Sequence, residues 1–167
     1  MKILIVRHGS AKDREKWHES GGMETQRPLS KRGEKKMELA AAGLHKLVEH
    51  VDVIMNSTYE RSIQTATIFQ EQFGLEKTQK SSFLEPGVHP QELVDHIREY
   101  PDSHTMMLVG HEPGLSGLVA YLTAGRHAEP FLYFRKGTAA LLECEGLPDA
   151  ARCSMKWFVT RQMLEDL

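Results

Sequence analysis

Near its N-terminus the chain reads Lys2-Ile3-Leu4-Ile5-Val6-Arg7-His8-Gly9. The apolar part of this run is short and rich in β-branched residues, which is typical of a strand buried on both faces of a parallel sheet. It is far too short for a signal peptide or a membrane span. A polar turn containing Gly9 follows, so we expect the strand to end there and to present Arg7 and His8 at its carboxyl end.

The rest of the chain alternates between helical and strand patterns. Helices are predicted from Ser30 to Val48, over Tyr59–Phe73, from Pro90 to before Pro101, and over Leu115–Leu122. The buried face of the first helix is predicted to consist of Met37, Ala40, Ala41, Leu44, Leu47 and Val48. Strands are predicted at Val51–Met55, Gln79–Phe83, Thr105–Val109, Thr138–Cys144 and Met155–Thr160, the last two antiparallel at a sheet edge. This alternation predicts a single α/β domain over residues 1–167, in three layers, with a mostly parallel sheet and helices on both faces.

One long polar segment, Ser10–Gln26, interrupts the alternation and contains Trp17 and two adjacent glycines. We expect a mobile loop beside the first strand rather than a separate unit. A loop in that place is positioned to act as a lid over residues that follow the strand.

Composition excludes several classes of protein. Lys and Arg number 21 against 23 Asp and Glu, and the net charge of −2 is not that of a general nucleic-acid binder. The hydrophobic fraction of 40% and the charged fraction of 26% argue against a disordered chain and against a membrane protein. The two cysteines, Cys144 and Cys153, are too few for a disulfide framework or a paired-cysteine zinc site. We expect both to be reduced, in a cytoplasmic protein.

Three of the predicted strands are followed directly by polar residues. Arg7-His8-Gly9 follows the first strand, Ser57–Arg61 follows the second, and His111–Gly114 follows a later one. In open α/β sheets ligands bind at the carboxyl ends of the strands, so these side chains are expected to converge on one cleft. Because cationic groups in one cleft repel one another, an anion is expected among them, and phosphate is the natural candidate.

Each of these residues has a chemical reason for its place. Arg7 and Arg61 carry planar forks that bind phosphate oxygens in pairs, and Arg27 is positioned to enter the same cleft. Nearby arginines favour the neutral form of His8, which can then attack phosphorus in line as the nucleophile. His111 is expected to be a protonated donor that stabilises the transferring phosphoryl group. The other histidines show no such convergence, and we interpret them as structural or solvated: His18, His45, His50, His89, His96, His104 and His127.

As an ordered set, these motifs resemble those of the histidine phosphatase superfamily. The matching residues are Arg7-His8-Gly9, Ser57-x-x-x-Arg61-x-x-x-Thr65-Ala66 and Gly110-His111-x-Pro113-Gly114. The short chain, together with Arg27-Pro28-Leu29-Ser30-x-x-Gly33 and Leu84-x-Pro86-Gly87, is most similar to the SixA-type phosphohistidine phosphatases. The similarity runs from Met1 to the strand predicted at Thr138–Cys144, and it implies a fold like that of the phosphoglycerate mutases.

The resemblance implies a covalent mechanism that needs no metal and no organic cofactor. In such a mechanism His8 takes the phosphoryl group and water then hydrolyses the phosphoenzyme. Arg7, Arg61 and His111 carry over as the phosphate pocket, and Arg27 matches a further arginine of the small members. The implied partner is a phosphorylated protein, with phosphohistidine as its reactive group, or a phosphorylated small molecule, and neither a nucleic acid nor a membrane. The chain departs from the usual family pattern at Ser10, Thr58 and Ser62, which lie outside the proposed chemistry.

A general acid is harder to assign. Relatives that cleave phosphate esters protonate the leaving alkoxide with a carboxylic acid, which contributes about 10²–10⁴-fold. Glu85 and Glu112 are the candidates in this chain, although a solvated carboxylate would explain either one equally well. Phosphohistidine depends less on such an acid, because a protonated imidazole leaves as a neutral ring. Few residues separate Phe83 from the helix at Pro90, and so short a segment favours an open pocket that suits a protein substrate.

Two alternative functions stay open at this point. One is a small-molecule phosphomonoesterase of the same superfamily with Glu85 as its acid, and the other is a non-catalytic module that binds phosphate. A zinc hydrolase is disfavoured because Leu115 stands where the second histidine of a zinc-binding helix would lie. The chain also has neither a Gly-Lys-Ser/Thr phosphate loop nor a Gly-x-Gly-x-x-Gly turn after its first strand.

Overall fold

Strand β1 (Lys2–Arg7) lies inside a six-stranded sheet with the order β3-β2-β4-β1-β5-β6. The computed structural model describes residues 1–167. Strands β2 (Val53–Asn56), β3 (Gln79–Lys80) and β4 (Thr105–Gly110) run parallel to β1, whereas β5 (Ala139–Cys144) is antiparallel to β1 and to β6 (Cys153–Val159). The predicted α/β architecture, a mostly parallel sheet with an antiparallel pair at one edge, is confirmed.

Strand β1 is buried on both faces, as its apolar sequence predicts. Ile3 and Ile5 belong to one hydrophobic cluster, and Leu4 and Val6 belong to the cluster on the opposite face. This division follows from the alternation of side chains along a strand. All four side chains are 0% exposed, so β1 is held from both sides and its carboxyl end is a rigid base for the residues that follow.

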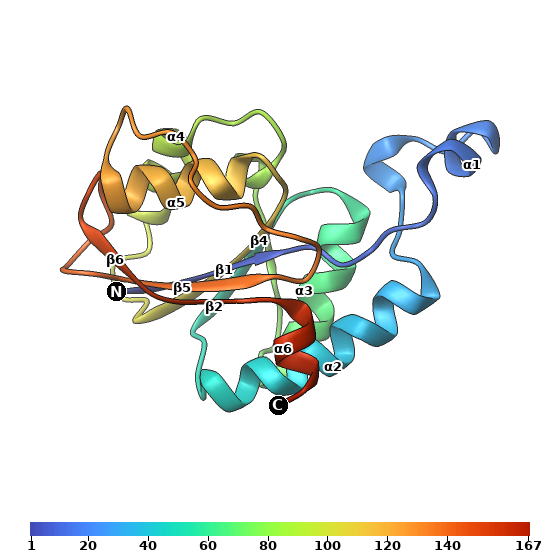
Figure 1. Ribbon diagram of the computed structural model, residues 1–167, viewed down its shortest axis with the longest axis horizontal. Coiled ribbons are helices and arrows are strands. Elements are labelled where there is room, and N and C mark those ends of the chain that lie inside the picture. The colour runs from blue at the N-terminus through green and yellow to red at the C-terminus, as the bar shows by residue number, and fades with distance from the viewer.

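Helices cover both faces of the sheet (Figure 1). Helices α2 (Lys31–Leu47), α3 (Glu60–Phe73) and α6 (Arg161–Glu165) pack on one face. Helices α4 (Pro90–Ile97) and α5 (Gly114–Ala124) pack on the other. No helix has the length and apolar character needed to cross a membrane.

Helix α2 begins where its sequence predicts. The Ser30 hydroxyl accepts a hydrogen bond from Gly33 N at 3.0 Å, which caps the first turn. The Ser10 carbonyl lies against the same turn, and a Cβ placed on Gly33 would be only 2.0 Å from its oxygen. Glycine at this position therefore allows the chain that leaves β1 to pack directly on the start of α2.

Three local predictions need correction. Leu47, predicted on the buried face of α2, is 41% exposed because the helix ends there, while Val48 just beyond it is buried. The strand predicted at Gln79–Phe83 covers only Gln79–Lys80, since Ser81 accepts a hydrogen bond from Phe83 N and starts a one-turn 3-10 helix, η2 (Ser82–Leu84). Beyond the last predicted strand, which ends at Thr160, the structure has a helix that the sequence pattern did not predict, α6.

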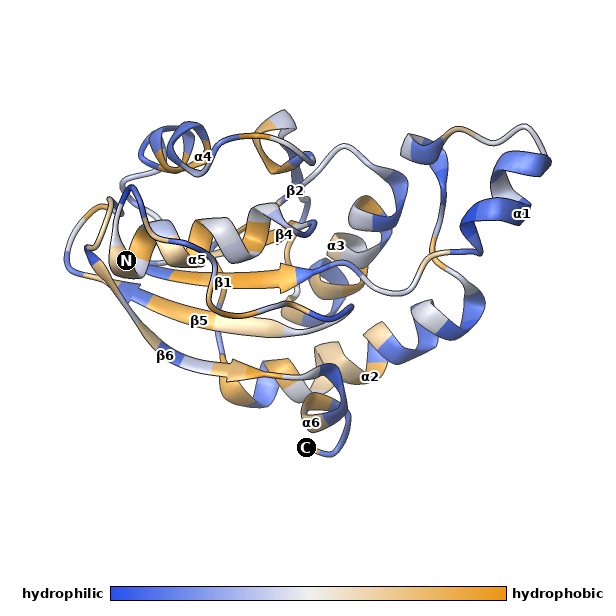
Figure 2. Cartoon of the chain, turned by 45° about the horizontal axis from the view of Figure 1, so that its top comes forward, coloured by the Kyte–Doolittle hydropathy of each residue, from blue (hydrophilic) through white to orange (hydrophobic).

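The segment Ser10–Gln26 is also more ordered than a loop. It contains helix α1 (Arg14–Glu19) and a one-turn 3-10 helix, η1 (Glu24–Gln26). The carboxylate of Asp13 caps α1 by accepting a hydrogen bond from Lys16 N at 3.0 Å. Helix α1 has no buried residue, and it projects from the body of the protein as a largely hydrophilic element (Figure 2).

The expectation that both cysteines are reduced is wrong. Cys144 and Cys153 form a disulfide that links β5 to β6. The two residues are direct partners in the antiparallel register, with their Cα atoms 4.0 Å apart. The cysteines therefore no longer support the expectation of a cytoplasmic location.

Candidate active site

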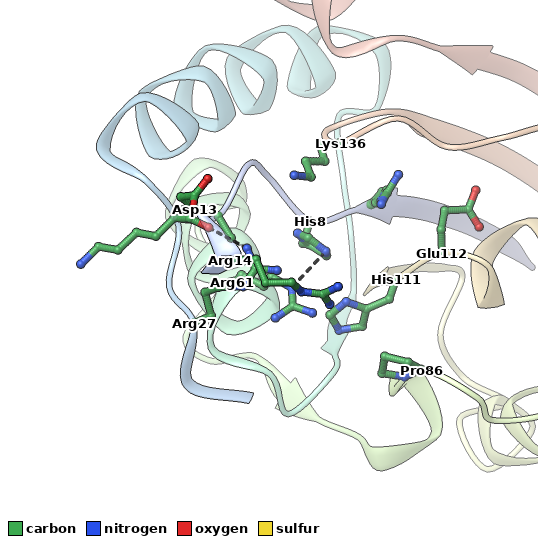
Figure 3. A pocket seen from close by; sticks show the side chains of 12 residues that line it. His8, Asp13, Arg14, Arg27, Arg61, Pro86, His111, Glu112 and Lys136 are labelled. Atoms are coloured by element: carbon green, nitrogen blue, oxygen red, sulfur yellow. Dashed lines mark hydrogen bonds between the residues drawn. The ribbon is translucent and has the colours of Figure 1, made fainter. Parts of the chain in front are cut away.

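Residues at the carboxyl ends of β1 and β4, together with the first turn of α3, which follows β2, line one wall of a cavity of about 570 Å³ (Figure 3). Arg7 on β1 is level with Gly110 on β4, and Asn56 on β2 is level with Val109, so the three strands end side by side. The residues that line the cavity are Arg7, His8, Ala11, Lys12, Asp13, Arg14, Arg27, Arg61, Pro86, His111, Glu112 and Lys136. All five arginine and histidine residues predicted from the sequence are among them.

His8 is held with one ring nitrogen fixed to the backbone. Its Nδ1 atom lies 2.7 Å from the carbonyl oxygen of Gly9, which can only accept, so Nδ1 carries the proton and donates it. The other nitrogen, Nε2, then has a free lone pair and accepts a hydrogen bond from Arg61 Nε at 3.2 Å. Burial, then the repulsion that His8 and His111 would feel if both rings were protonated, and the charges of Arg61 and Arg7 hold the pKa of His8 well below its usual value of 6.5. At neutral pH the ring is therefore uncharged and has the tautomer that a nucleophile needs.

His111 lies beside His8, with the two ring centroids 4.8 Å apart. Its Nε2 atom is 2.9 Å from the Ser57 hydroxyl, which follows β2. Burial and the charges of Arg61 and Arg7 lower the pKa of His111 to about 3. The expectation of a protonated His111 is therefore wrong for this arrangement, because burial and the arginines both oppose a further positive charge. A neutral ring still offers one N–H donor.

Arg7 is fixed by the loop that precedes β5. Its Nη1 donates to the carbonyl oxygen of Phe134 at 2.5 Å and to the hydroxyl of Tyr133 at 3.0 Å. Its Nε is buried and has no hydrogen-bond partner in the protein. A buried donor of this kind costs free energy when it stays unpaired, so Arg7 fits a site whose ligand is an anion.

Arg27 and Arg61 are joined by a carboxylate that the sequence interpretation missed, that of Glu24. Arg27 binds it in a two-pronged contact, with Nε 3.0 Å from Oε2 and Nη2 2.9 Å from Oε1. Arg61 Nη2 is 3.3 Å from the same Oε1, and Arg14 Nη2 is 3.1 Å from it. The hydrogen bonds from Arg27 and Arg14 hold the pKa of Glu24 far below its usual range. Its position three residues before Arg27 is the one signal in the sequence that could have pointed to it.

Lys136 is a second residue that the sequence interpretation missed. Its backbone is fixed beside β1, because Gly137 N donates to the Arg7 carbonyl at 3.1 Å and Arg7 N donates to the Thr138 carbonyl at 3.1 Å. In Figure 3 the Lys136 side chain lies on the other side of His8 from Arg61 and His111. Burial and the charges of Arg7, Arg27 and Arg61 lower the pKa of Lys136. The cavity thus carries three cationic residues beyond the predicted set, Lys12, Arg14 and Lys136.

Neither candidate for a general acid is free in the main cavity. Glu112 lines it, but its carboxylate accepts hydrogen bonds from Ser116 N at 3.1 Å, from the Ser116 hydroxyl and from Phe134 N at 2.6 Å. Glu112 thereby holds the loop whose carbonyl binds Arg7. Glu85 lies outside the main cavity, in a smaller hollow that His111 also lines, and accepts a hydrogen bond from the Thr58 hydroxyl.

A family profile and one sequence relative match this chain. The profile of the histidine phosphatase superfamily (branch 1) matches residues 3–89. An uncharacterized protein of Picosynechococcus sp. is 29% identical over 145 residues, covering 76% of this chain and 78% of the relative.

Solved structures show the same fold. The chain is similar to the protein histidine phosphatase SixA complexed with tungstate, with a TM-score of 0.82, 20% identity, and coverage of 98% of this chain and 99% of that one. It is also similar to a mycobacterial glucosyl-3-phosphoglycerate phosphatase, with a TM-score of 0.72, 16% identity, and coverage of 95% and 99%.

Proposed function

The chain belongs to the histidine phosphatase superfamily, and from this premise we propose that it hydrolyses protein phosphohistidine through a covalent intermediate on His8. The observation that carries the proposal is the state of the His8 ring. Its Nδ1–H is committed to the Gly9 carbonyl, and its Nε2 lone pair faces a cavity lined by Arg7, Arg61 and His111.

In the first step, His8 Nε2 attacks the phosphorus atom and the bond from phosphorus to the substrate nitrogen breaks. The leaving imidazole is protonated on its distal nitrogen, so it departs as a neutral ring. Arg61 Nε has to move from Nε2 to a phosphoryl oxygen, because the lone pair that it now binds forms the new bond. Arg7 and the ring of His111, which line the cavity, bind the other oxygens as charge develops on them.

In the second step, a water molecule attacks the phosphorus atom and the bond to His8 Nε2 breaks. Both protons of the water stay on oxygens of the phosphate, which leaves as dihydrogen phosphate, and the electron pair of the broken bond returns to His8 Nε2. The Gly9 carbonyl keeps Nδ1 protonated throughout, which stabilises the positive charge of the phosphorylated ring and returns the nucleophile in its starting tautomer.

A protein substrate is supported by the shape of the chain around the site. Only residues 85–89 lie between η2 and α4, so no long insertion stands over the cavity at that side. Neither Glu85 nor Glu112 is free in the cavity to protonate an alkoxide, and phosphohistidine is the substrate that depends least on such an acid. The fold is also that of a protein histidine phosphatase.

A small-molecule phosphomonoesterase is the second candidate. Glu85 lies in the hollow next to His111, where a change in the Thr58 contact would bring a carboxyl group near the leaving group. The same fold occurs in a glucosyl-3-phosphoglycerate phosphatase.

Rapid quench into alkali, in which phosphohistidine is stable, with a ³²P-labelled phosphohistidine protein tests the proposal. We expect label on His8, loss of label and turnover in His8→Ala, and normal behaviour in a control, His127→Ala, which changes an exposed histidine. Turnover in His8→Ala would refute the covalent scheme. Comparing the rate on phosphohistidine with the rate on p-nitrophenyl phosphate, before and after Glu85→Gln, separates the two candidates. A selective loss of ester hydrolysis would favour the second one.

A further inference from the structure

Glu24 contacts the arginines of the site without lining the cavity that they line. We propose that Glu24 is a positioning residue for phosphoryl transfer, which holds Arg27 and Arg61 from behind in the orientation that presents them to the phosphoryl group. This inference rests on the proposed function.

The contacts of Glu24 fix both guanidinium groups in direction as well as in distance. Both carboxylate oxygens bind Arg27 at 2.9 and 3.0 Å, the fork-to-fork geometry that sets the plane of a guanidinium. Arg27 Nη1 donates a hydrogen bond to the Lys12 carbonyl oxygen at 2.7 Å, so every nitrogen of this side chain has a hydrogen-bond partner. The Arg27 and Arg61 side chains are only 10% and 6% exposed, and at such depth a charge is costly unless it is paired.

Arg61 depends on Glu24 for its contact with the nucleophile. Its Nη1 donates to the Glu24 backbone carbonyl at 3.0 Å, and its Nη2 lies 3.3 Å from the Glu24 carboxylate. These two contacts turn its third nitrogen, Nε, toward His8 Nε2. Loss of the carboxylate frees one of the two contacts and lets the guanidinium rotate away from the atom that attacks phosphorus.

The position of Glu24 distinguishes this role from two others. A carboxylate that occupied the phosphoryl position would line the cavity, which Glu24 does not. A carboxylate that only offset the arginine charges would weaken anion binding, so that its removal would strengthen the binding of phosphate. A positioning carboxylate predicts the opposite, because misdirected arginines bind the anion less well.

This proposal gives the segment Ser10–Gln26 a role in orienting the arginines of the site. Glu24 sits on η1 at its end, and Arg14 on α1 binds the same carboxylate. Besides lining the cavity with residues 11–14, the segment contributes to the site through the orientation of two arginines that belong to the rest of the fold.

Three variants test the role of Glu24. Glu24→Gln removes the charge, and Glu24→Asp keeps the charge but withdraws the carboxylate by one methylene. Glu19→Gln is the control, because it also replaces a glutamate by glutamine, but at an exposed residue of α1 that forms no ion pair. The readouts are the binding of inorganic phosphate by titration calorimetry, the single-turnover rate of His8 phosphorylation at saturating substrate, and thermal unfolding. We expect Glu24→Gln to weaken phosphate binding and to slow phosphorylation by about 10- to 100-fold, since a misplacement of about 1 Å costs on that order. Glu24→Asp should lose part of the phosphate affinity and part of the phosphorylation rate, and Glu19→Gln should match the wild type in both quantities.

These measurements decide whether Glu24 positions the two arginines. Tighter phosphate binding in Glu24→Gln, or wild-type affinity and rate in Glu24→Asp, would overturn the positioning role. If Glu24→Gln does not fold, Glu24→Asp alone decides, because a charge-only role predicts no loss there. If wild-type protein forms no phosphoenzyme, the proposed function fails, while the calorimetric comparison still tests how Glu24 acts on the anion site.

Discussion

Gly33→Ala is expected to damage the active site from a distance, through the backbone. The added Cβ would lie 2.0 Å from the Ser10 carbonyl oxygen, and ordinary contact begins near 3.4 Å, so the two must separate by at least 1 Å. The Ser10 carbonyl and the first turn of α2 cannot move apart easily, because Ser30 N also donates a hydrogen bond to the Ser10 carbonyl oxygen at 2.9 Å. Since Ser10 is two residues from His8, the shift is passed to the chain that carries the nucleophile.

The clash at Gly33 sets the expected loss of stability and the expected loss of rate in Gly33→Ala. Overpacking of this kind costs about 1–3 kcal/mol of unfolding free energy. A displacement of about 1 Å at the nucleophile lowers the rate of phosphoryl transfer by about 100-fold. Urea denaturation gives the first quantity, and the single-turnover rate of His8 phosphorylation gives the second.

Gly117→Ala is the matched control. A Cβ there meets only Pro90, at 3.5 Å, and the residue lies within α5. We expect an unchanged rate and equal or greater stability, because alanine favours a helix by up to about 1 kcal/mol over glycine. Wild-type stability and rate in Gly33→Ala would refute the argument that this glycine is required by the Ser10 carbonyl.

Three further predictions follow from the site and the sheet. Arg7→Met should slow phosphorylation by about 10³-fold or more in single-turnover assays, with only partial recovery in Arg7→Lys, which lacks the Nε donor. The rings of His8 and His111 should remain uncharged at pH 5.5 by NMR. The pKa values of both rings are lowered in the folded protein, so below pH 6.5 the unfolded chain binds protons that the folded chain does not. The free energy of unfolding should therefore decrease as the pH falls through about 6.5. A free energy of unfolding that is the same at pH 7.5 and pH 5.5 would contradict this prediction. Reducing the Cys144–Cys153 disulfide should lower the unfolding midpoint and leave the phosphorylation rate unchanged, because Cys144 N bonds to the Met1 carbonyl, at the end of β1 away from His8. A rate that changed with reduction would contradict this placement.

Much of the site could be predicted because its residues directly follow strands. A buried apolar run ends at Arg7, and similar runs end before Ser57 and Gly110, so the carboxyl edge of a parallel sheet was bound to gather them. Glu24 could not be found in this way. Its contact with Arg61 joins residues 37 apart in sequence, and it depends on η1, whose single turn has no strong sequence signal.

The protonation of His111 and the cysteine pairing also lay beyond local patterns. The charge on a histidine depends on burial and on neighbouring charges, which come from three separate segments here. The disulfide depends on which residues of β5 and β6 are opposite each other, and the hairpin register alone decides that.

The sequence by itself determined the order of the strands and of helices α2 to α5, the cap of α2, and the set of cationic residues at the strand ends, because these follow from periodicity and from short-range hydrogen bonding. Only the tertiary structure decided the tautomer of His8, the neutral state of His111 and the carboxylate behind the arginines. Those properties depend on distances of about 3 Å between atoms from separate segments and on the exclusion of water around them, and both arise only when the chain is packed.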